Sequence, residues 1–218
     1  MASMGLQMTA FIIALIAMCG VIAATLLPNW KINADTGANI VTAVIQMQGL
    51  WMDCTWYSTG MVSCTVKYSI LSLPLYIQTA RTTMVLSCIF SCLGIFVSIA
   101  GMKCTRLGGD GQTKSNVAFA GGTCFLLAGI FGMISVSWYL KEIISNFLDP
   151  SIPESIKHEP GGAVYVGFLS AGMHVLSGII FCATCTKNQQ QRHNSPPTKP
   201  ADSEAENSNA GYNLQDYV

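Results

Sequence analysis

The chain has 218 residues, of which eleven are Lys or Arg and eleven are Asp or Glu, so its formal net charge is zero. Charged residues make up only 10% of the sequence, against about a quarter in an ordinary soluble domain. A balanced charge supplies no basic field for nucleic acid, and an apolar content of 51% is too high for an intrinsically disordered chain. Composition therefore excludes these two classes and makes the placement of the apolar residues the main question.

Four apolar stretches are each long enough to cross a bilayer as a helix, which takes roughly 20 residues. None of them contains Lys, Arg, Asp or Glu, as the hydropathy rule for transmembrane helices requires. The predicted spans are residues 8–27, 82–102, 117–140 and 162–186. Residues 1–7 lack the Lys or Arg of a secretory signal, so we expect the first span to be retained.

An even number of spans places both termini on one side of the membrane. Lys and Arg are denser in residues 103–116 and in the tail, 187–218, than in residues 28–80. Because positive residues favour the cytoplasmic side, we expect both termini in the cytoplasm and two extracellular loops, residues 28–80 and 141–161. Residues 1–186 then form one four-span membrane domain.

The first extracellular loop has the pattern of a small antiparallel sheet. Residues 40–47 are β-branched and apolar, and two short runs, 49–54 and 61–68, flank a turn-like segment at residues 57–60. Such runs separated by a Gly-containing turn are typical of a hairpin.

The second extracellular loop is broken by Pro150, Pro153 and Pro160, which forbid a continuous helix. We expect residues 141–147 to extend the third helix beyond the bilayer.

The tail, residues 187–218, is rich in Gln, Asn, Ser, Pro and Glu over residues 188–211 and is predicted to be disordered, because it cannot bury enough apolar area. It ends in Asp216-Tyr217-Val218, whose hydrophobic carboxylate terminus suits capture in the groove of a PDZ domain.

The cysteines are predicted to lie on different sides of the membrane, which gives them different chemistry. Cys54 and Cys64 are the pair predicted outside the cell, where a disulfide is stable, so we expect a bridge between them. Cys104, Cys182 and Cys185 lie at the cytoplasmic ends of spans and are candidates for palmitoylation. One alternative is that these thiols are inert. Another is that Cys182 and Cys185 form a metal or redox pair, although a metal site needs further ligands.

Several of these residues together resemble the signature of the claudin family. The matching features are Trp30, Gly49-Leu50-Trp51, Cys54, Cys64, Arg81 at the entrance of the second span, residues 147–150 and the final Tyr217-Val218. The resemblance covers the whole chain.

The resemblance implies a membrane α+β fold: a left-handed four-helix transmembrane bundle that carries an extracellular five-stranded antiparallel sheet. The first loop would supply four strands and residues 161–166 the fifth. Trp30, Gly49, Leu50 and Trp51 would hold the sheet against the bilayer surface, and indole rings favour the water–lipid interface. Closely spaced small residues within the spans agree with tight helix packing in lipid.

Claudins form the strands of tight junctions, so the resemblance implies a plasma-membrane protein that controls the passage of ions and solutes between cells. It implies contacts with other claudins in cis and in trans, with Phe147, Pro150 and Glu159 as second-loop contact residues. PDZ-domain scaffold proteins of the zonula occludens type are the implied cytoplasmic partners. Cofactors and nucleic acid are not implied.

In claudins the charge just after the second signature cysteine helps to set ion preference. Here those residues are Thr65, Val66 and Lys67, with Asp53 beside the first cysteine. We hypothesise that Lys67 disfavours Na⁺ and gives a barrier or a weak anion preference. The alternative is that Lys67 is a solvated residue at a strand end. The other charged residues of the extracellular loops are mostly acidic, which argues against an anion preference.

Enzyme signatures are absent: we find neither a phosphate-binding Gly-rich loop nor a nucleophile elbow nor a His-Glu-x-x-His helix. His174 lies within the fourth span, where a proton or ligand role competes with hydrogen bonding to Ser135 or Ser137 on the third. The main alternative function is an auxiliary subunit of a membrane channel or receptor with a claudin-like fold. Such subunits usually carry glycosylation sequons outside, and neither loop here contains one.

Overall fold

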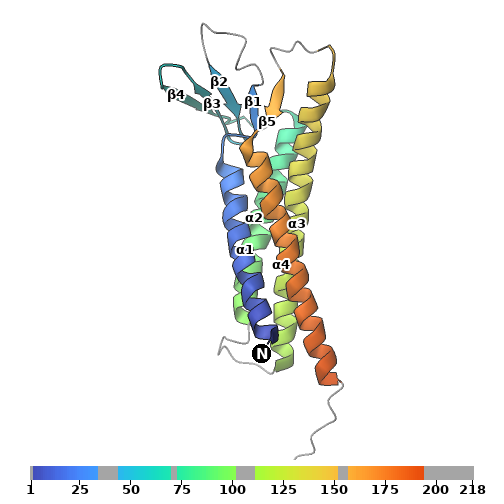
Figure 1. Cartoon of the computed structure of the whole chain (residues 1–218). Coiled ribbons are helices and arrows are strands. Elements are labelled where there is room, and N and C mark those ends of the chain that lie inside the picture. Colours follow the sequence, from blue (N-terminus) through green and yellow to red (C-terminus); the bar gives the residue numbers. More distant parts are fainter. Residues whose placement is uncertain (1, 34–43, 70–72, 102–110, 152–156, 194–218) are drawn as a thin grey trace, which may run out of the picture.

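In the computed structural model, four long helices lie side by side and a small sheet sits on one end of them (Figure 1). The structure describes residues 2–33, 44–69, 73–101, 111–151 and 157–193. Each helix is long and apolar enough to cross a membrane. The helices are α1, Ala2–Leu26; α2, Leu75–Gly101; α3, Gly111–Leu148; and α4, Gly162–His193. The four predicted spans are confirmed.

The helices are longer than the predicted spans at five ends: the starts of α1, α2 and α3 and the ends of α3 and α4. α2 begins at Leu75, within the predicted loop of residues 28–80, because Pro74 precedes it and its carbonyl accepts a hydrogen bond from the Ile77 amide at 3.0 Å. α3 begins at Gly111 and continues to Leu148, so the predicted extension of the third helix over residues 141–147 is confirmed. The prediction of disorder from residue 187 was wrong as far as His193, since α4 continues to that residue.

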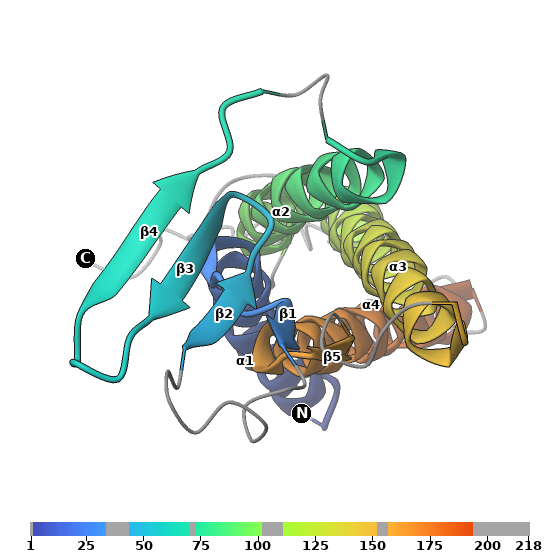
Figure 2. The same ribbon diagram turned by 90° about the horizontal axis from the view of Figure 1, so that it is seen from above.

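The sheet has five antiparallel strands in the order β4-β3-β2-β1-β5. Seen from above in Figure 2, β1 and β5 lie over the helices, whereas β3 and β4 extend to one side beyond them. The strands are β1, Lys31–Asn33; β2, Ile45–Gln48; β3, Met52–Trp56; β4, Val62–Val66; and β5, His158–Pro160.

Two strand predictions in the first loop need correction. Residues 49–54 are not one strand, because Gly49, Leu50 and Trp51 form a turn and β3 begins at Met52. In the predicted strand at residues 40–47, β2 begins only at Ile45, and residues 40–43 lie outside the described part of the chain.

The predicted position of the fifth strand was wrong. β5 is His158–Pro160, and residues 162–166 already belong to α4. Gly161 makes the junction: its amide donates to the Trp30 carbonyl at 2.9 Å, and a Cβ atom there would lie only 2.4 Å from the Asn29 carbonyl oxygen. The β-branched residues that favoured a strand are helical because a backbone entering lipid must satisfy its own hydrogen bonds.

The predicted turn at residues 57–60 is confirmed between β3 and β4. The Tyr57 amide donates to the Met61 carbonyl at 3.0 Å, and the Gly60 amide donates to the Tyr57 carbonyl at 2.9 Å. Gly60 has a φ angle of 81°, which glycine adopts without steric cost.

Small residues bring the helices close together, as the sequence predicted. A Cβ atom on Gly20 would lie 2.8 Å from the Ser170 Cβ, and one on Gly94 would lie 2.8 Å from the Phe125 ring. In lipid, where hydrophobicity does not drive helices together, such close packing is the main source of association.

Buried serines add hydrogen bonds between helices, and His174 takes part in one of them. Its Nε2 lies 2.7 Å from the Ser91 hydroxyl of α2, so the predicted partners on α3 were wrong. Ser135 instead donates to the Ala80 carbonyl at 3.1 Å. His174 Nδ1 lies 3.1 Å from the Ser170 carbonyl, which can only accept, so Nδ1 is the donor in this contact.

Replacing Gly178 by Ala tests the tightness of the bundle. The new methyl would meet the Gly122 carbonyl oxygen and the Leu126 amide nitrogen at 2.9 Å, and both are backbone atoms that cannot move aside. We expect a loss of roughly 1–3 kcal/mol of stability, measured by thermal unfolding in detergent. The matched Gly5→Ala variant, where nothing lies within 4 Å, is expected to keep or raise the melting temperature. Equal melting temperatures for the two variants would contradict this packing.

Candidate functional site

The sheet is fixed to the helices by four residues of the claudin-like signature, Trp30, Leu50, Trp51 and Arg81, which we call the anchor. Leu50 and Trp30 are fully buried in the core between the sheet and the helix ends. The Gly49 amide donates to the Met52 carbonyl at 3.0 Å, and this tight turn directs Leu50 into that core.

Only glycine fits at position 49, because there is no room for a side chain. A Cβ atom on it would lie 2.5 Å from the Pro28 Cα atom and 2.9 Å from the Met52 carbonyl oxygen. The backbone of the β2–β3 turn therefore lies directly against the chain that leaves α1, and any side chain would separate them.

Trp30 occupies the protein core, which corrects the expectation that its ring sits at the lipid interface. Its Nε1 donates to the Ala24 carbonyl at 2.8 Å, and its ring contacts Tyr139 of α3 edge-on at a centroid distance of 4.9 Å. Trp30 therefore joins the end of α1 to α3 beneath the sheet.

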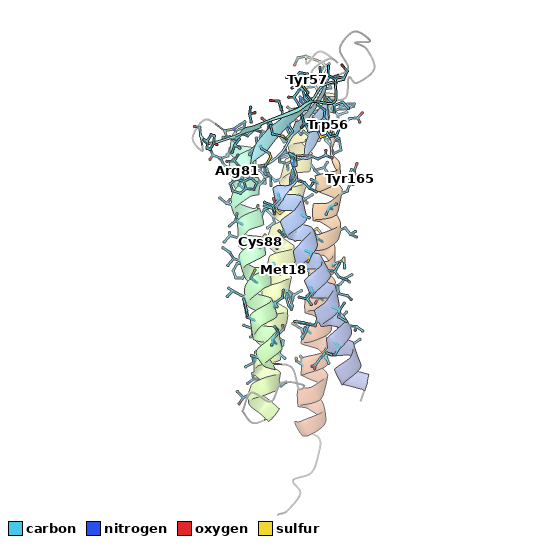
Figure 3. The ribbon with its side chains drawn as sticks, turned by 90° about the vertical axis from the view of Figure 1, so that its left-hand side faces the viewer. Met18, Trp56, Tyr57, Arg81, Cys88 and Tyr165 are labelled. Carbon is cyan, nitrogen blue, oxygen red and sulfur yellow. A yellow bond between two sulfur atoms is a disulfide. The ribbon has the colours of Figure 1, made fainter. Side chains whose placement is uncertain are left out.

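Arg81 connects α2 to the β2–β3 turn. Its Nε donates to the Leu50 carbonyl at 2.6 Å, and its guanidinium lies 4.9 Å from the Trp51 ring. Figure 3 shows Arg81 near the upper end of α2, directly below the sheet. One buried cation thus satisfies a buried carbonyl and stacks on an aromatic face, which a lysine cannot do equally well.

Lys31 is a buried cation that the sequence did not single out. Only 6% of it is exposed, and its Nζ donates to the Tyr76 hydroxyl at 3.2 Å and lies 5.8 Å from the Tyr139 ring. Burial lowers the pKa of the Lys31 ammonium, and the nearby Glu142 carboxylate opposes this in part. No local sequence pattern marks Lys31, because its partners come from α2 and α3.

The predicted disulfide between Cys54 and Cys64 is confirmed and joins β3 to β4. The two residues are also directly opposite each other in the strand register. Because β4 pairs only with β3 among the described strands, this covalent bond fixes the outermost strand to the rest of the sheet.

The strand register gives the outer part of the sheet one polar and one apolar face. The polar face carries Gln46, Gln48, Asp53, Thr55, Ser63 and Thr65. The apolar face carries Ile45, Met47, Met52, Trp56, Val62 and Val66, together with the disulfide. Side chains two residues apart on a strand share a face, which also places Lys67 on the polar side.

Lys67 and Asp53 form an ion pair on the polar face. Lys67 Nζ lies 2.8 Å from Asp53 Oδ1, with the two side chains 18% and 35% exposed. Thr65 is exposed opposite Asp53 in the register. The sequence named all three residues as candidates for ion selectivity but did not predict that two of them neutralise each other.

The predicted second-loop contact residues are exposed at the outer end of the molecule. Phe147 is in the last turn of α3, its ring centroid lies 5.3 Å from Lys157 Nζ, and Pro150 follows in a turn. Asp149 accepts hydrogen bonds from the Ser151 hydroxyl at 2.7 Å and amide at 3.0 Å, which lower its pKa.

Glu159 is exposed in β5, where it lies opposite Ile32 of β1. The structure therefore places Glu159 in the sheet itself and Phe147 and Pro150 at the end of α3.

The palmitoylation candidates differ in accessibility. Cys185 is buried, whereas Cys182 is partly exposed, with its sulfur 3.0 Å from the position of a Cβ atom on Gly122 of α3. Cys104 and the terminal residues Asp216, Tyr217 and Val218 lie outside the described part of the chain. Within the described residues, no group of three or more His, Cys, Asp or Glu could hold a metal ion.

The fold and these signature residues agree with the comparison to known proteins. The chain is 42% identical to human claudin-2 over 194 residues, which cover 89% of this chain and 84% of that protein. It is 40% identical to human claudin-19 over 206 residues, covering 94% and 92%, and 38% identical to mouse claudin-14 over 199 residues, covering 91% and 83%.

The chain belongs to the PMP-22/EMP/MP20/Claudin family, whose sequence profile matches residues 4–181. Its relatives make it a membrane protein of the tight junction with a structural part in the barrier or channel between cells. Contact with other claudins follows from the same membership.

Replacing Arg81 by Gln tests the anchor. The variant leaves the buried Leu50 carbonyl without its donor and removes the contact with Trp51, so we expect a loss of about 1–3 kcal/mol in thermal unfolding. The control, Lys141→Gln, removes a positive charge from an exposed site near the same end of the bundle and is expected to change stability by less than about 0.5 kcal/mol. Equal losses in the two variants would show that charge, and not the anchor, is responsible.

Removing the disulfide by the double replacement of Cys54 and Cys64 by Ser is expected to cost about 3 kcal/mol on the chain-entropy model for a loop of this size. Hydrogen exchange should increase in β3 and β4 first and leave the helices protected. The matched Cys19→Ser variant replaces a free, exposed cysteine and should exchange like the wild type. Unchanged exchange in both strands would contradict the assigned role.

Proposed function

We propose that this protein forms tight-junction strands that act as a barrier, or as a weakly anion-preferring path, and not as a cation channel. The observation that carries this proposal is the polar face, where Asp53 is the one carboxylate among the described residues of β2, β3 and β4 and is paired with Lys67. A passage lined by uncharged Thr, Ser and Gln side chains offers Na⁺ no fixed negative charge.

The ion pair bears on whether the strands act as a barrier or as a weakly anion-preferring path. The sequence-based hypothesis treated Lys67 as an unpaired cation that repels Na⁺, but its Nζ lies 2.8 Å from Asp53 Oδ1. Two opposite charges in contact largely cancel each other at a distance. Salt at physiological concentration screens most of the remaining field beyond about 8 Å. This supports a barrier more than an anion preference.

Assembly with other claudins would use the exposed outer surfaces. In Figure 3, Trp56 and Tyr57 lie at the outer end of the sheet, away from the helices, where they are open to contact a protein of the facing cell. Phe147, Pro150 and Glu159 are open to neighbours in the same or the facing membrane. The proposal therefore includes partners both in cis and in trans.

On the cytoplasmic side, we place both termini and the PDZ-binding end, Asp216-Tyr217-Val218, with zonula occludens scaffold proteins as partners. Palmitoylation stays a prediction at Cys104, Cys182 and Cys185. The burial of Cys185 supports inert packing there.

The test is an epithelial monolayer without its own claudins, in which the wild type and Lys67→Glu are expressed and dilution potentials are recorded. The wild type should raise resistance and show little ion preference or a weak preference for Cl⁻. Lys67→Glu puts two carboxylates side by side and should raise the Na⁺ to Cl⁻ permeability ratio about threefold or more.

The control variant, Lys141→Glu, changes an exposed charge on α3 and should leave the ratio unchanged. An unaltered ratio in Lys67→Glu would show that the polar face does not line the passage. A wild type that reaches cell contacts without any electrical effect would favour the auxiliary-subunit function.

A further inference from the structure

The Asp53–Lys67 pair is held by the backbone on both sides. Asp53 lies within β3 between Gln48 of β2 and Thr65 of β4 in the register. The Lys67 amide donates to the Trp51 carbonyl at 2.9 Å, so the backbone pairing continues one residue beyond β4. The pair therefore results from the fold and does not depend on two flexible side chains meeting by chance.

The surroundings keep Lys67 directed toward Asp53. Its Nζ also lies 3.5 Å from the Gly49 carbonyl oxygen, in the tight β2–β3 turn of the anchor. Only 18% of the Lys67 side chain is exposed, whereas Asp53 is 35% exposed. The more accessible member of the pair is the carboxylate.

Other charges near the polar face are set back from it. Lys31 shares this side of the sheet but is buried against Tyr76 and Tyr139. Arg81 interacts electrostatically with Asp53, yet it is buried beneath the turn and bonded to the Leu50 carbonyl. The remaining side chains on this face of β2, β3 and β4 are uncharged: Gln46, Gln48, Thr55, Ser63 and Thr65.

We infer that Asp53 is a selectivity-determining residue whose negative charge is masked by Lys67. This inference rests on the proposed function, since it assumes that the polar face borders the path between cells. A pair of opposite charges 2.8 Å apart acts on a passing ion as a short dipole, whose effect falls off faster than that of a single charge. Loss of either member exposes the other, so one site can give opposite ion preferences.

The experiment compares Asp53→Asn, Lys67→Gln and the double variant by dilution potentials in monolayers without their own claudins. Asp53→Asn leaves Lys67 unpaired and should raise the Cl⁻ to Na⁺ permeability ratio about threefold, as expected for one charge roughly 6 Å from the path in water once screening at physiological salt is included. Lys67→Gln removes the cation that contacts the Asp53 carboxylate and should lower the ratio by a similar factor. The double variant should return the ratio to that of the wild type.

Two controls separate charge from folding. Lys141→Gln removes one charge from an exposed position outside the strands and should leave the ratio unchanged. The exchanged pair, Asp53→Lys with Lys67→Asp, keeps both charges at the same two positions and should resemble the wild type. Freeze-fracture of each line shows whether strands form.

Each outcome is decisive. Strands that form while either single variant leaves the ratio unchanged would overturn the inference and spare the proposed function. Shifts in the same direction from both single variants would also overturn it, because charge masking requires opposite signs. Absence of strands and of resistance in the wild type would overturn the proposed function and the inference with it.

Discussion

The structure depends on one constraint: the β2–β3 turn must be buried in the ends of four membrane helices without leaving its polar backbone unsatisfied. Leu50 and Trp30 fill the space, Gly49 permits the close approach, and Arg81 donates to the Leu50 carbonyl at 2.6 Å. A sheet with strands of three to five residues is marginally stable alone. Its stability and its orientation on the bundle therefore come from the anchor.

The anchor also determines what the sheet presents to its surroundings. β3 and β4 project beyond the helices (Figure 2), and every residue of β4 is exposed. The register separates a polar face from an apolar one, and the disulfide keeps the outer strand in that register. Asp53 and Lys67 lie next to the anchor, which explains how two surface charges can be held 2.8 Å apart.

Features set by local sequence were predictable, and features set by distant contacts were not. The spans, the turn at residues 57–60 and the disulfide follow from composition, turn residues and compartment. The fifth strand was misplaced because Pro160 and Gly161 end it early to fit Asn29, far away in the sequence. The partner of His174, the burial of Lys31 and the pairing of Lys67 with Asp53 likewise depend on which elements the fold brings together.

The most direct test of the central claim, that the buried turn fixes the sheet to the helices, is hydrogen–deuterium exchange of Leu50→Ala and the wild type in lipid nanodiscs. The account predicts that amides throughout β2 and β3 exchange faster together in the variant, because they lose a common support, while the four helices remain protected. Faster exchange confined to residues 49–51, or unchanged exchange in both strands, would show that the sheet holds its position without the anchor.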